Sequence, residues 1–524
     1  MKKTILCLLL CLALAMSALP VSASHIDPID DNFRTFYQIF VGSFSDSNRD
    51  GLGDLRGIID RMDYLNDGDV NSGKSLGIQG IWLSPIFSSP SYHKYDATDY
   101  YSIDWRFGRM EDLQELIDLC HERNVKLILD LVINHTSHKH PWFEAFKAAR
   151  ISGDTSDPYY DYYSCAQEGE MTPGVTYQKL AAGCPWWYEC NFSPEMPELN
   201  FDNPTVREEV RKVAKFYLDM GIDGFRFDAV KYVYFGDTAR SVDFWEWYME
   251  ELTAMKPDIY CVGECWSGEG EILDYYSAMN CFNFAMSQAE GMAAAAAKGA
   301  NLQKFTGYVQ SFQEKVLDRN PNGMPMPFLS NHDMDRIGGC FASDLFMRMA
   351  ANLYLLSPGS PMIYYGEELG MRGSRGGSNT DANRRLAMLW GDEDLVRDPQ
   401  GANYPSKNQI TTTAQEQIAD EGSLYNYYCK LLQLRHNHPA IARGSYDSLG
   451  MVDKKLGGFY IAYGEDSVVL LHNTDMEEAE MDLAACKDLS GRVPTEILDT
   501  IGYGGAVLDG TVLTIAPYTS VVLK

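Results

Sequence analysis

An arginine and an aspartate stand two positions apart in "GFRFDAVKY" (224–232), a segment that otherwise has the apolar composition of a buried β-strand. Side chains alternate along a strand, so Arg226 and Asp228 are expected on one face with Val230, and the two phenylalanines on the other. Buried charges are costly unless they are paired and hydrogen-bonded. The pattern therefore favours a functional acid held beside an internal arginine, with a purely structural ion pair as the alternative.

Acids and histidines also end three other strand-like segments. They are Asp130 and His135 in and after "VKLILDLVIN" (125–134), Glu264 in "DIYCVGECW" (258–266), and His332 with Asp333 in "MPFLSNHD" (326–333). Each alone could be a helix cap or a turn acid. Several carboxylates without a metal-type His/Cys cluster indicate acid/base and nucleophilic carboxylate chemistry, of which glycoside hydrolysis is the leading case.

Strand-like runs alternate with helical patterns over most of the chain, which is typical of β/α units around a parallel sheet. The eight predicted strands cover 35–44, 78–86, 125–134, 223–230, 258–266, 282–288, 326–333 and 360–368. No GxGxxG motif follows the first strand, so a (β/α)8 TIM barrel is favoured over a doubly wound sheet. In such a barrel, acids at the carboxyl ends of strands meet at one face.

The remaining segments predict four further boundaries. Residues 1–23 have two lysines, an apolar run and small residues suited to cleavage, so they predict a signal peptide and a secreted protein. The barrel is expected over 24–135 and 205–434. About seventy Pro-, Gly- and aromatic-rich residues at 136–204 are too many for a loop and predict a small inserted domain after the third strand. Short alternating runs over 435–524 predict a C-terminal antiparallel β-sandwich.

Composition limits the partners. The 524 residues are 45% hydrophobic and 22% charged, as in a globular protein, and the net charge of −29 argues against nucleic acid. No segment after the leader is long and apolar enough to span a membrane. Cys165, Cys184 and Cys190 could form one disulfide, and buried thiols are the alternative. A monomer is favoured, although the sequence does not show the oligomeric state.

Several motifs, in order, resemble the signature regions of the α-amylase family of glycoside hydrolases, family 13. They are "DLVINHTS" (130–137), "GFRFDAVKY" (224–232), "GECW" (263–266) and "FLSNHD" (328–333), supported by "GIQGIWLSPIF" (77–87), "YHKYDATDYYSID" (92–104), "MPELN" (196–200) and "PMIYYGEELGM" (361–371). The resemblance spans nearly the whole chain after the leader. It implies a retaining glucan hydrolase of the α-amylase type, intermediate between the oligo-1,6-glucosidase and neopullulanase branches.

The resemblance also implies roles for particular residues. Asp228 is the expected nucleophile, Glu264 the general acid/base, and Asp333 the third acid that orients the sugar. A retaining mechanism needs the first two carboxyls about 5–5.5 Å apart, with Glu264 protonated at the start. The residues expected to bind substrate are Tyr95, Asp96, His135, Arg226, Lys231 and His332.

A calcium site is expected in "DSNRDGLGD" (46–54), between the first strand and its helix. Oxygen-bearing side chains at alternate positions resemble the first half of an EF-hand loop, but Gly57 stands where an EF-hand needs a glutamate. Oligo-1,6-glucosidase relatives bind structural calcium in a similar loop, which implies the ligands Asp46, Asn48, Asp50, Asp54 and the Leu52 carbonyl. An acid-rich turn without an ion is the alternative.

Departures from the family pattern bear on a second calcium site and on specificity. Asn134 matches one ligand of the site between barrel and insert, but Glu198 and Tyr232 replace the usual Asp and His, so that site is doubtful. "MPELN", Ala229 and Lys231 favour α-1,4 linkages of starch or maltooligosaccharides. An α-glucosidase or oligo-1,6-glucosidase, or a transglycosylating glucanotransferase, remains an alternative. A scaffold protein on this fold would lack the three acids.

Overall fold

Eight parallel strands form a closed barrel in the computed structural model, which describes residues 31–378, 380–451 and 453–524. The strand order in the sheet is β12-β11-β10-β9-β5-β2-β1-β13. A parallel bridge between Phe328 and Met362 joins its two ends. The predicted TIM barrel is therefore confirmed, whereas the predicted signal peptide, residues 1–23, lies outside the described residues.

Every predicted barrel strand corresponds to an observed strand, but the observed strands are shorter. They are β1 (Phe36–Ile39), β2 (Gly80–Leu83), β5 (Lys126–Leu131), β9 (Gly224–Phe227), β10 (Tyr260–Gly263), β11 (Asn280–Asn283), β12 (Met326–Pro327) and β13 (Met362–Tyr364). The β12 strand stops well before the predicted end at residue 333, and in the segment that follows it Asn331 Oδ1 accepts a hydrogen bond from the Asp333 amide. This local turn takes the chain out of the sheet before the acid.

Helices surround the barrel in the order that β/α units require. They are α2 (Leu55–Asp60), α3 (Met62–Leu65), α4 (Met110–Glu122), α6 (Pro204–Met220), α7 (Thr238–Met255), α8 (Glu269–Tyr275), α9 (Met292–Ala297), α10 (Leu302–Arg319), α11 (Asp344–Leu355), α12 (Ala414–Ala419), α13 (Leu424–Asn437) and α14 (Pro439–Arg443). The apolar residues at every third or fourth position of α4, such as Leu113, Leu116 and Ile117, are buried, as an amphipathic helix requires.

The alternation of side chains separates two cores. Phe225 and Phe227 of β9 belong to the core between strands and helices, whereas Phe36 and Trp82 fill the barrel interior. Arg226 has the alternate orientation and lies opposite Asp130 of β5 in the register of the two strands. Both side chains are fully buried and ion-paired inside the barrel. Where Arg226 and Asp130 meet, an ion pair therefore fills the barrel interior in place of apolar side chains.

The β9 strand ends at Phe227, three residues before the end of the predicted strand 223–230. Ala229 has φ 51° and ψ 44°, a left-handed conformation that is uncommon for a residue with a Cβ. The turn sends Val230 into a 3₁₀ helix, η2 (Val230–Tyr232), and into the outer core. The prediction that Val230 shares a face with Arg226 is therefore wrong, because the strand does not continue that far.

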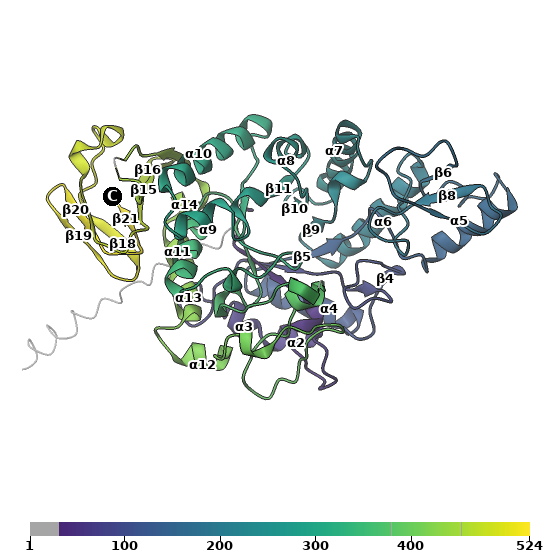
Figure 1. The fold of residues 1–524 in the computed structure, drawn as a ribbon, viewed down its shortest axis with the longest axis horizontal. Coiled ribbons are helices and arrows are strands. Elements are labelled where there is room, and N and C mark those ends of the chain that lie inside the picture. Colours follow the sequence, from purple (N-terminus) through teal and green to yellow (C-terminus); the bar gives the residue numbers. More distant parts are fainter. Residues whose placement is uncertain (1–30, 379, 452) are drawn as a thin grey trace, which may run out of the picture. The chain divides into compact units, whose positions relative to one another are not determined.

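The predicted insertion follows the third barrel strand. Between β5 and α6 lie helix α5 (Pro141–Ser152) and a small antiparallel sheet of β6 (Cys165–Gln167), β8 (Trp186–Glu189) and β7 (Tyr177–Lys179). A two-stranded ribbon of β3 (Phe87–Ser88) and β4 (Asp99–Ile103) follows β2. Figure 1 shows the inserted elements in blue beyond α7, on the side away from the C-terminal strands.

The C-terminal segment forms the predicted antiparallel sandwich. Its sheets have the orders β14-β15-β16-β21-β18 and β17-β20-β19. Leu471 and Val521 of the first sheet share one core with Leu513 and Ile515 of the second. The strands are β14 (Ser445–Ser448), β15 (Leu456–Tyr463), β16 (Asp466–Asn473), β17 (Ala479–Asp482), β18 (Ile497–Gly502), β19 (Ala506–Asp509), β20 (Val512–Ile515) and β21 (Thr519–Leu523).

Candidate active site

Arg226 holds two aspartates at the mouth of the barrel. Its Nη1 donates to Asp228 Oδ1 at 2.6 Å and to Asp130 Oδ1 at 2.9 Å. The Arg226 and Asp130 side chains are wholly buried, whereas Asp228 retains 12% of its side-chain exposure. Asp228 is therefore the member of this group that a substrate can reach, and the predicted pairing with Arg226 is present.

Glu264 lies directly after β10, beside the end of β9. Its Oε2 accepts a hydrogen bond from the Ala229 amide at 3.1 Å, and its backbone amide donates to the Phe227 carbonyl. The left-handed conformation of Ala229 thus directs an N–H toward this carboxyl. Burial raises the pKa of Glu264 to about 8, and the negative charges of Asp228 and Asp333 add to the increase while Arg226 opposes it. Glu264 is accordingly protonated at neutral pH.

Asp333 has the opposite environment. Arg385 Nη2 donates to its Oδ1 at 2.8 Å, and His332 Nε2 lies 3.0 Å from its Oδ2. Burial opposes ionisation, but His332 and Arg385 outweigh burial and hold the pKa of Asp333 well below its usual range. Burial also lowers the pKa of His332, so Arg385 is the partner that still carries a positive charge beside Asp333 when the imidazole is neutral.

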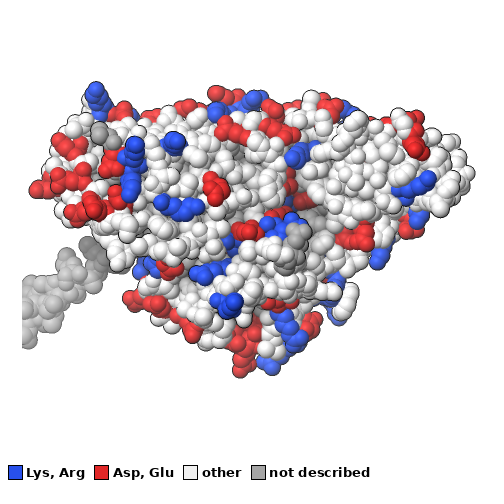
Figure 2. All heavy atoms as spheres, viewed as in Figure 1, with Lys and Arg blue, Asp and Glu red and all other residues white. Residues whose placement is uncertain are grey.

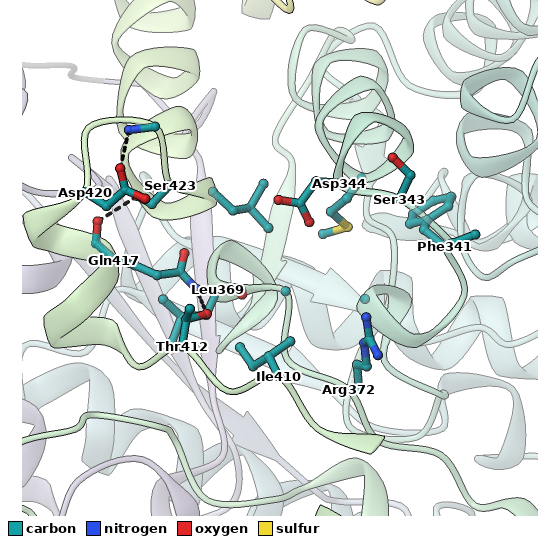
Figure 3. A pocket seen from close by; sticks show the side chains of 16 residues that line it. Phe341, Ser343, Asp344, Leu369, Arg372, Ile410, Thr412, Gln417, Asp420 and Ser423 are labelled. Carbon is teal, nitrogen blue, oxygen red and sulfur yellow. Dashed lines mark hydrogen bonds between the residues drawn. The ribbon is translucent and has the colours of Figure 1, made fainter. Parts of the chain in front are cut away.

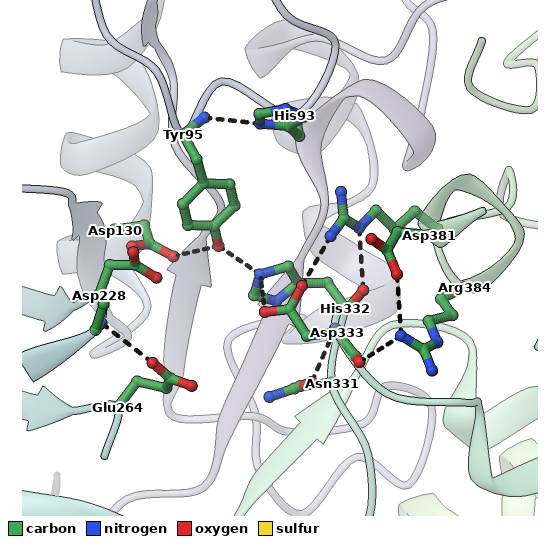
Figure 4. Close-up of polar contacts among 12 residues, drawn as sticks. His93, Tyr95, Asp130, Asp228, Glu264, Asn331, His332, Asp333, Asp381 and Arg384 are labelled. Atoms are coloured by element: carbon green, nitrogen blue, oxygen red, sulfur yellow. Dashed lines mark hydrogen bonds and ion pairs between the residues drawn. The ribbon is translucent and has the colours of Figure 1, made fainter. Parts of the chain in front are cut away.

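Tyr95 connects the two groups of acids (Figure 4). Its hydroxyl donates to Asp130 Oδ2 at 2.8 Å and lies 2.6 Å from His332 Nε2, and its ring stacks on the imidazole at 5.2 Å. Gln38 Nε2 lies 2.7 Å from His332 Nδ1. A neutral imidazole with its proton on Nε2 satisfies all of these contacts. The predicted substrate residues Tyr95 and His332 are therefore fixed in orientation.

The other predicted substrate residues lie around this group. Asp96 is buried and its Oδ1 accepts hydrogen bonds from the hydroxyls of Ser89 and Ser91. His135 is buried, and its Nε2 has no hydrogen-bond partner among the described residues. Lys231 donates from Nζ to the Trp266 carbonyl at 2.7 Å. An orphaned polar atom at a reactive cleft is consistent with a ligand contact.

Some members of the site are absent from the sequence-based prediction. Asp130 was recognised only as a strand-end acid, and Gln38, His93 and Arg385 were not singled out. Arg385 contacts Asp333 from the chain beyond β13, and burial lowers the pKa of His93 to about 4. For Asp130, its place inside the apolar run 125–134 was a usable signal, as it was for Arg226 in its own strand. Arg385 lies in a segment without periodic structure, so the sequence offers no comparable signal.

The predicted calcium loop is a series of tight turns. Asp46 accepts hydrogen bonds from the amides of Asn48, Arg49 and Gly51, and Asp50 accepts one from Leu52. Asp54 caps α2 through the Gly57 amide. Across residues 31–378, 380–451 and 453–524, no three His, Cys, Asp or Glu side chains gather closely enough to hold a metal ion. The carboxylate, amide and carbonyl oxygens of the loop are donors that suit calcium chemically. The calcium site at residues 46–54 stays a prediction.

The doubtful second metal position contains a pair of carboxyls. Asn134 Oδ1 is buried without a partner, and Glu198 is backbone-paired with His135. Burial, followed by the charge of Glu189, raises the pKa of Glu198 well above its usual range. Nearby, the three cysteines of the insert are free, as are all ten cysteines that the structure describes.

Two hollows can be distinguished. Figure 2 shows the surface hollowed between the barrel and the inserted segment, with acidic and basic side chains on its walls. A separate cavity of about 300 Å³ lies beside the first turn of α11 and is lined by Phe341, Asp344, Leu369, Arg372 and Gln417 among others (Figure 3). None of the predicted site residues lines this second cavity.

A parallel barrel with an arginine-paired aspartate and a glutamic acid of raised pKa at neighbouring strand ends is an arrangement that glycoside hydrolases use. The chain belongs to the α-amylase family, because residues 38–444 match the family described as "Alpha amylase, catalytic domain". The family expected from the sequence motifs is thus confirmed.

Individual relatives agree with this assignment. "Alpha-amylase 3" of Dictyoglomus thermophilum is 38% identical over 84% of this chain and 85% of its own length. "4-alpha-glucanotransferase" of Thermotoga maritima is 30% identical over 84% of this chain and 96% of its own. The solved structure of Eubacterium rectale Amy13B has a TM-score of 0.86 and 34% identity, with 95% and 96% of the two chains covered.

Proposed function

We propose that this protein hydrolyses α-1,4-glucosidic bonds of starch or maltooligosaccharides with retention of configuration. Asp228 attacks the anomeric carbon and forms a glycosyl ester, while Glu264 gives its proton to the departing glycosidic oxygen. In the second step Glu264 takes a proton from water, which attacks the same carbon and releases Asp228. Asp333, fixed by Arg385, supports the positive charge that develops on the sugar ring.

One observation carries this proposal. The carboxyls of Asp228 and Glu264 follow neighbouring strands, yet one is paired with Arg226 and the other is kept protonated by burial. Two carboxyls in opposite environments are what a nucleophile and a general acid require. The named relatives include an amylase and a glucanotransferase, which supports α-1,4-glucan chemistry but leaves the preferred acceptor to experiment.

Product analysis tests the linkage and the substrate. The protein is incubated with soluble starch, maltotriose, isomaltose and pullulan, and the products are separated by chromatography. Starch and maltotriose are expected to be cleaved and isomaltose to remain intact, since "MPELN" and Ala229 favour α-1,4 linkages. Release of glucose only from isomaltose and other short substrates, with starch untouched, would replace the amylase assignment with the oligo-1,6-glucosidase alternative.

Calcium is proposed as a structural ion of the 46–54 loop. Saturating calcium, at a hundredfold excess over its Kd, is expected to stabilise the fold by about 2.7 kcal/mol. The measurement is thermal unfolding with calcium and with chelator, in wild type and in Asp50→Ala, which removes one exposed donor. Asp69→Ala, in an exposed turn after α3 that also accepts a backbone hydrogen bond, is the control. Equal unfolding temperatures of the wild type under both conditions would favour the ion-free turn.

Export from the cell is proposed from the leader pattern alone. Within the described part of the chain, no helix combines the length and apolar composition needed to cross a membrane. Mass determination of the N-terminus after expression in an exporting host tests the proposal. A mature chain that begins near residue 24 is expected, and recovery of the uncleaved chain inside the cell would contradict it.

A further inference from the structure

The cavity of about 300 Å³ beside the first turn of α11, the α11 pocket, is built by residues other than those of the candidate active site. Its walls come from the segment between β12 and α11, from the chain that follows β13, and from α12 with the beginning of α13 (Figure 3). Ligand sites in proteins range from about 300 to 1,000 Å³, so the pocket has room for a small molecule. The proposed hydrolysis makes no use of it.

Two opposite charges line the α11 pocket without pairing to each other (Figure 3). Asp344 is the first residue of α11, and its carboxylate makes no hydrogen bond or ion pair with another described residue. Arg372 is fixed by its backbone, because its amide and its carbonyl both bond to the side chain of Gln409. Its Nη1 lies 3.5 Å from the Asn408 carbonyl oxygen, too far for a strong hydrogen bond. The pocket therefore offers one acceptor group and one donor group with unused capacity.

The wall between α12 and α13 is fixed by its own hydrogen bonds. Gln417 donates from Nε2 to the Leu369 carbonyl at 2.9 Å, and its Oε1 accepts from the Tyr425 amide at 3.2 Å. Ser423 donates to the Gln417 carbonyl at 2.7 Å and caps α13 by accepting from the Asn426 amide. This wall is therefore preformed, which lowers the entropy cost of binding a ligand.

Apolar side chains make up much of the remaining wall. Phe341, Met347, Leu369 and Leu424 line the pocket, and each is at most 8% exposed. A pyranose ring has apolar C–H faces and a rim of hydroxyl groups, and each hydroxyl both donates and accepts hydrogen bonds. A carboxylate only accepts and a guanidinium only donates, so hydroxyl groups can satisfy both of the free charged groups. The lining therefore suits a sugar, with a ring face against the apolar side chains.

The charges around the pocket argue against an ionic ligand. Asp344 and Asp420 supply two negative charges and Arg372 one positive charge. The N-termini of α11 and α13 adjoin the pocket, and each contributes about half a positive charge, so the sum is close to zero. Among the residues described by the structure, no three acidic, histidine or cysteine side chains are grouped to hold a metal ion. A neutral ligand is therefore favoured over an anion or a metal cation.

We propose that the α11 pocket is a non-catalytic binding site, separate from the catalytic acids, for a neutral sugar of one or two pyranose rings. Asp344 accepts hydrogen bonds from sugar hydroxyls, Arg372 donates to sugar oxygens, and the apolar side chains contact one face of a ring. No covalent bond is made or broken at this site. The class of ligand follows from the groups of the pocket itself, so the proposal does not depend on the proposed function.

Hydrogen exchange measured by mass spectrometry can locate the sugar. The full-length Asp228→Asn protein is incubated with maltose, so that the probe is not consumed, and peptides that cover 338–347 and 410–424 report on the pocket. Peptides that cover 224–232 report separately on the catalytic cleft. Slower exchange is expected in both pocket segments. At a maltose concentration of ten times Kd, local openings that require release of the sugar should become about elevenfold rarer.

Variants in the same background assign the protection to the two charged groups. In Arg372→Met and in Asp344→Asn, the maltose concentration that half-protects the pocket peptides should rise at least about tenfold, or roughly 1.4 kcal/mol, because a hydrogen bond to a charged group is lost. Glu111→Gln removes an exposed acid from the first turn of α4 and is the control, for which no change is expected. Protection of 224–232 should persist in every variant, and thermal unfolding confirms that each variant is folded.

Three outcomes would overturn the proposal. Maltose could leave the pocket segments of the Asp228→Asn protein unprotected, or protect them equally in Arg372→Met and Asp344→Asn. Inorganic phosphate could protect them where maltose does not, which would make the pocket an anion site. Each of these results leaves the hydrolase assignment intact. Failure of the wild type to cleave starch, by contrast, would overturn the proposed function, and protection of the pocket segments by maltose would still support the sugar site.

Discussion

Asparagine in place of Asp228 is expected to lower kcat/KM on soluble starch by at least about 10⁴-fold, equivalent to roughly 5.4 kcal/mol of transition-state stabilisation. An amide cannot form the glycosyl ester that the retaining mechanism requires. Arg226 can still donate to the amide oxygen, and Asp130 still pairs with Arg226, so the fold is expected to survive. The measurements are the release of reducing sugar and the unfolding temperature.

A smaller variant makes the test of Asp228 specific. In Asp228→Ala, azide can enter the space of the lost carboxylate and attack α-maltosyl fluoride directly. A single displacement inverts the anomeric carbon, so β-maltosyl azide is the expected product. Asp509→Asn, an exposed acid of β19, is the control and should keep full activity on starch. Retention of more than about one hundredth of the activity by both Asp228 variants would place the nucleophile elsewhere.

The barrel could be predicted because each of its strands and helices has a recognisable pattern in a short stretch of sequence. A buried parallel strand is a short apolar run, and each run here is followed by a helical pattern. The residues at which the strands end were harder to predict from the sequence. Phe328 bridges Met362 beyond the last residue of β12, and the apolar letters continue toward His332 although the ladder has stopped. Apolar loop residues that cover the barrel mouth have the same composition as strand residues, so composition alone overextends the strands.

The residues of the site that lie close to strand ends could also be predicted from the sequence. Asp228 and Glu264 directly follow β9 and β10, and His332 lies in the loop after β12, so the strand order indicates that they meet. Residues that contact the acids only through the tertiary structure could not be identified from the sequence pattern. Arg385 reaches Asp333 from an irregular segment, and Ala229 turns its amide toward Glu264 through a conformation that its side chain does not favour. Electrostatic tuning of the acids depends on those contacts, which sequence patterns do not specify.

Glutamine in place of Glu264 is expected to lower kcat/KM on starch by about 10²–10⁴-fold, the usual contribution of a general acid. The loss should depend on the leaving group. A sugar oxygen needs a proton as it departs, whereas fluoride departs without one, so glycosyl-enzyme formation from α-maltosyl fluoride should be largely spared. Azide should then attack the glycosyl-enzyme and give α-maltosyl azide, the anomer opposite to that from Asp228→Ala. The same anomer from both variants would refute the division of roles.

The pH dependence provides an independent measurement of the same group. Burial raises the pKa of Glu264 to about 8, and the protonated form is the catalytic one. Wild-type kcat/KM on starch should therefore fall tenfold per pH unit above about pH 8. Glu264→Gln cannot lose this proton, so the decline should disappear in its residual activity, while Glu269→Gln, a surface control paired with Lys315, should retain it. Persistence of the decline in Glu264→Gln would assign it to another buried acid such as Asp130, whose pKa burial raises to about 7.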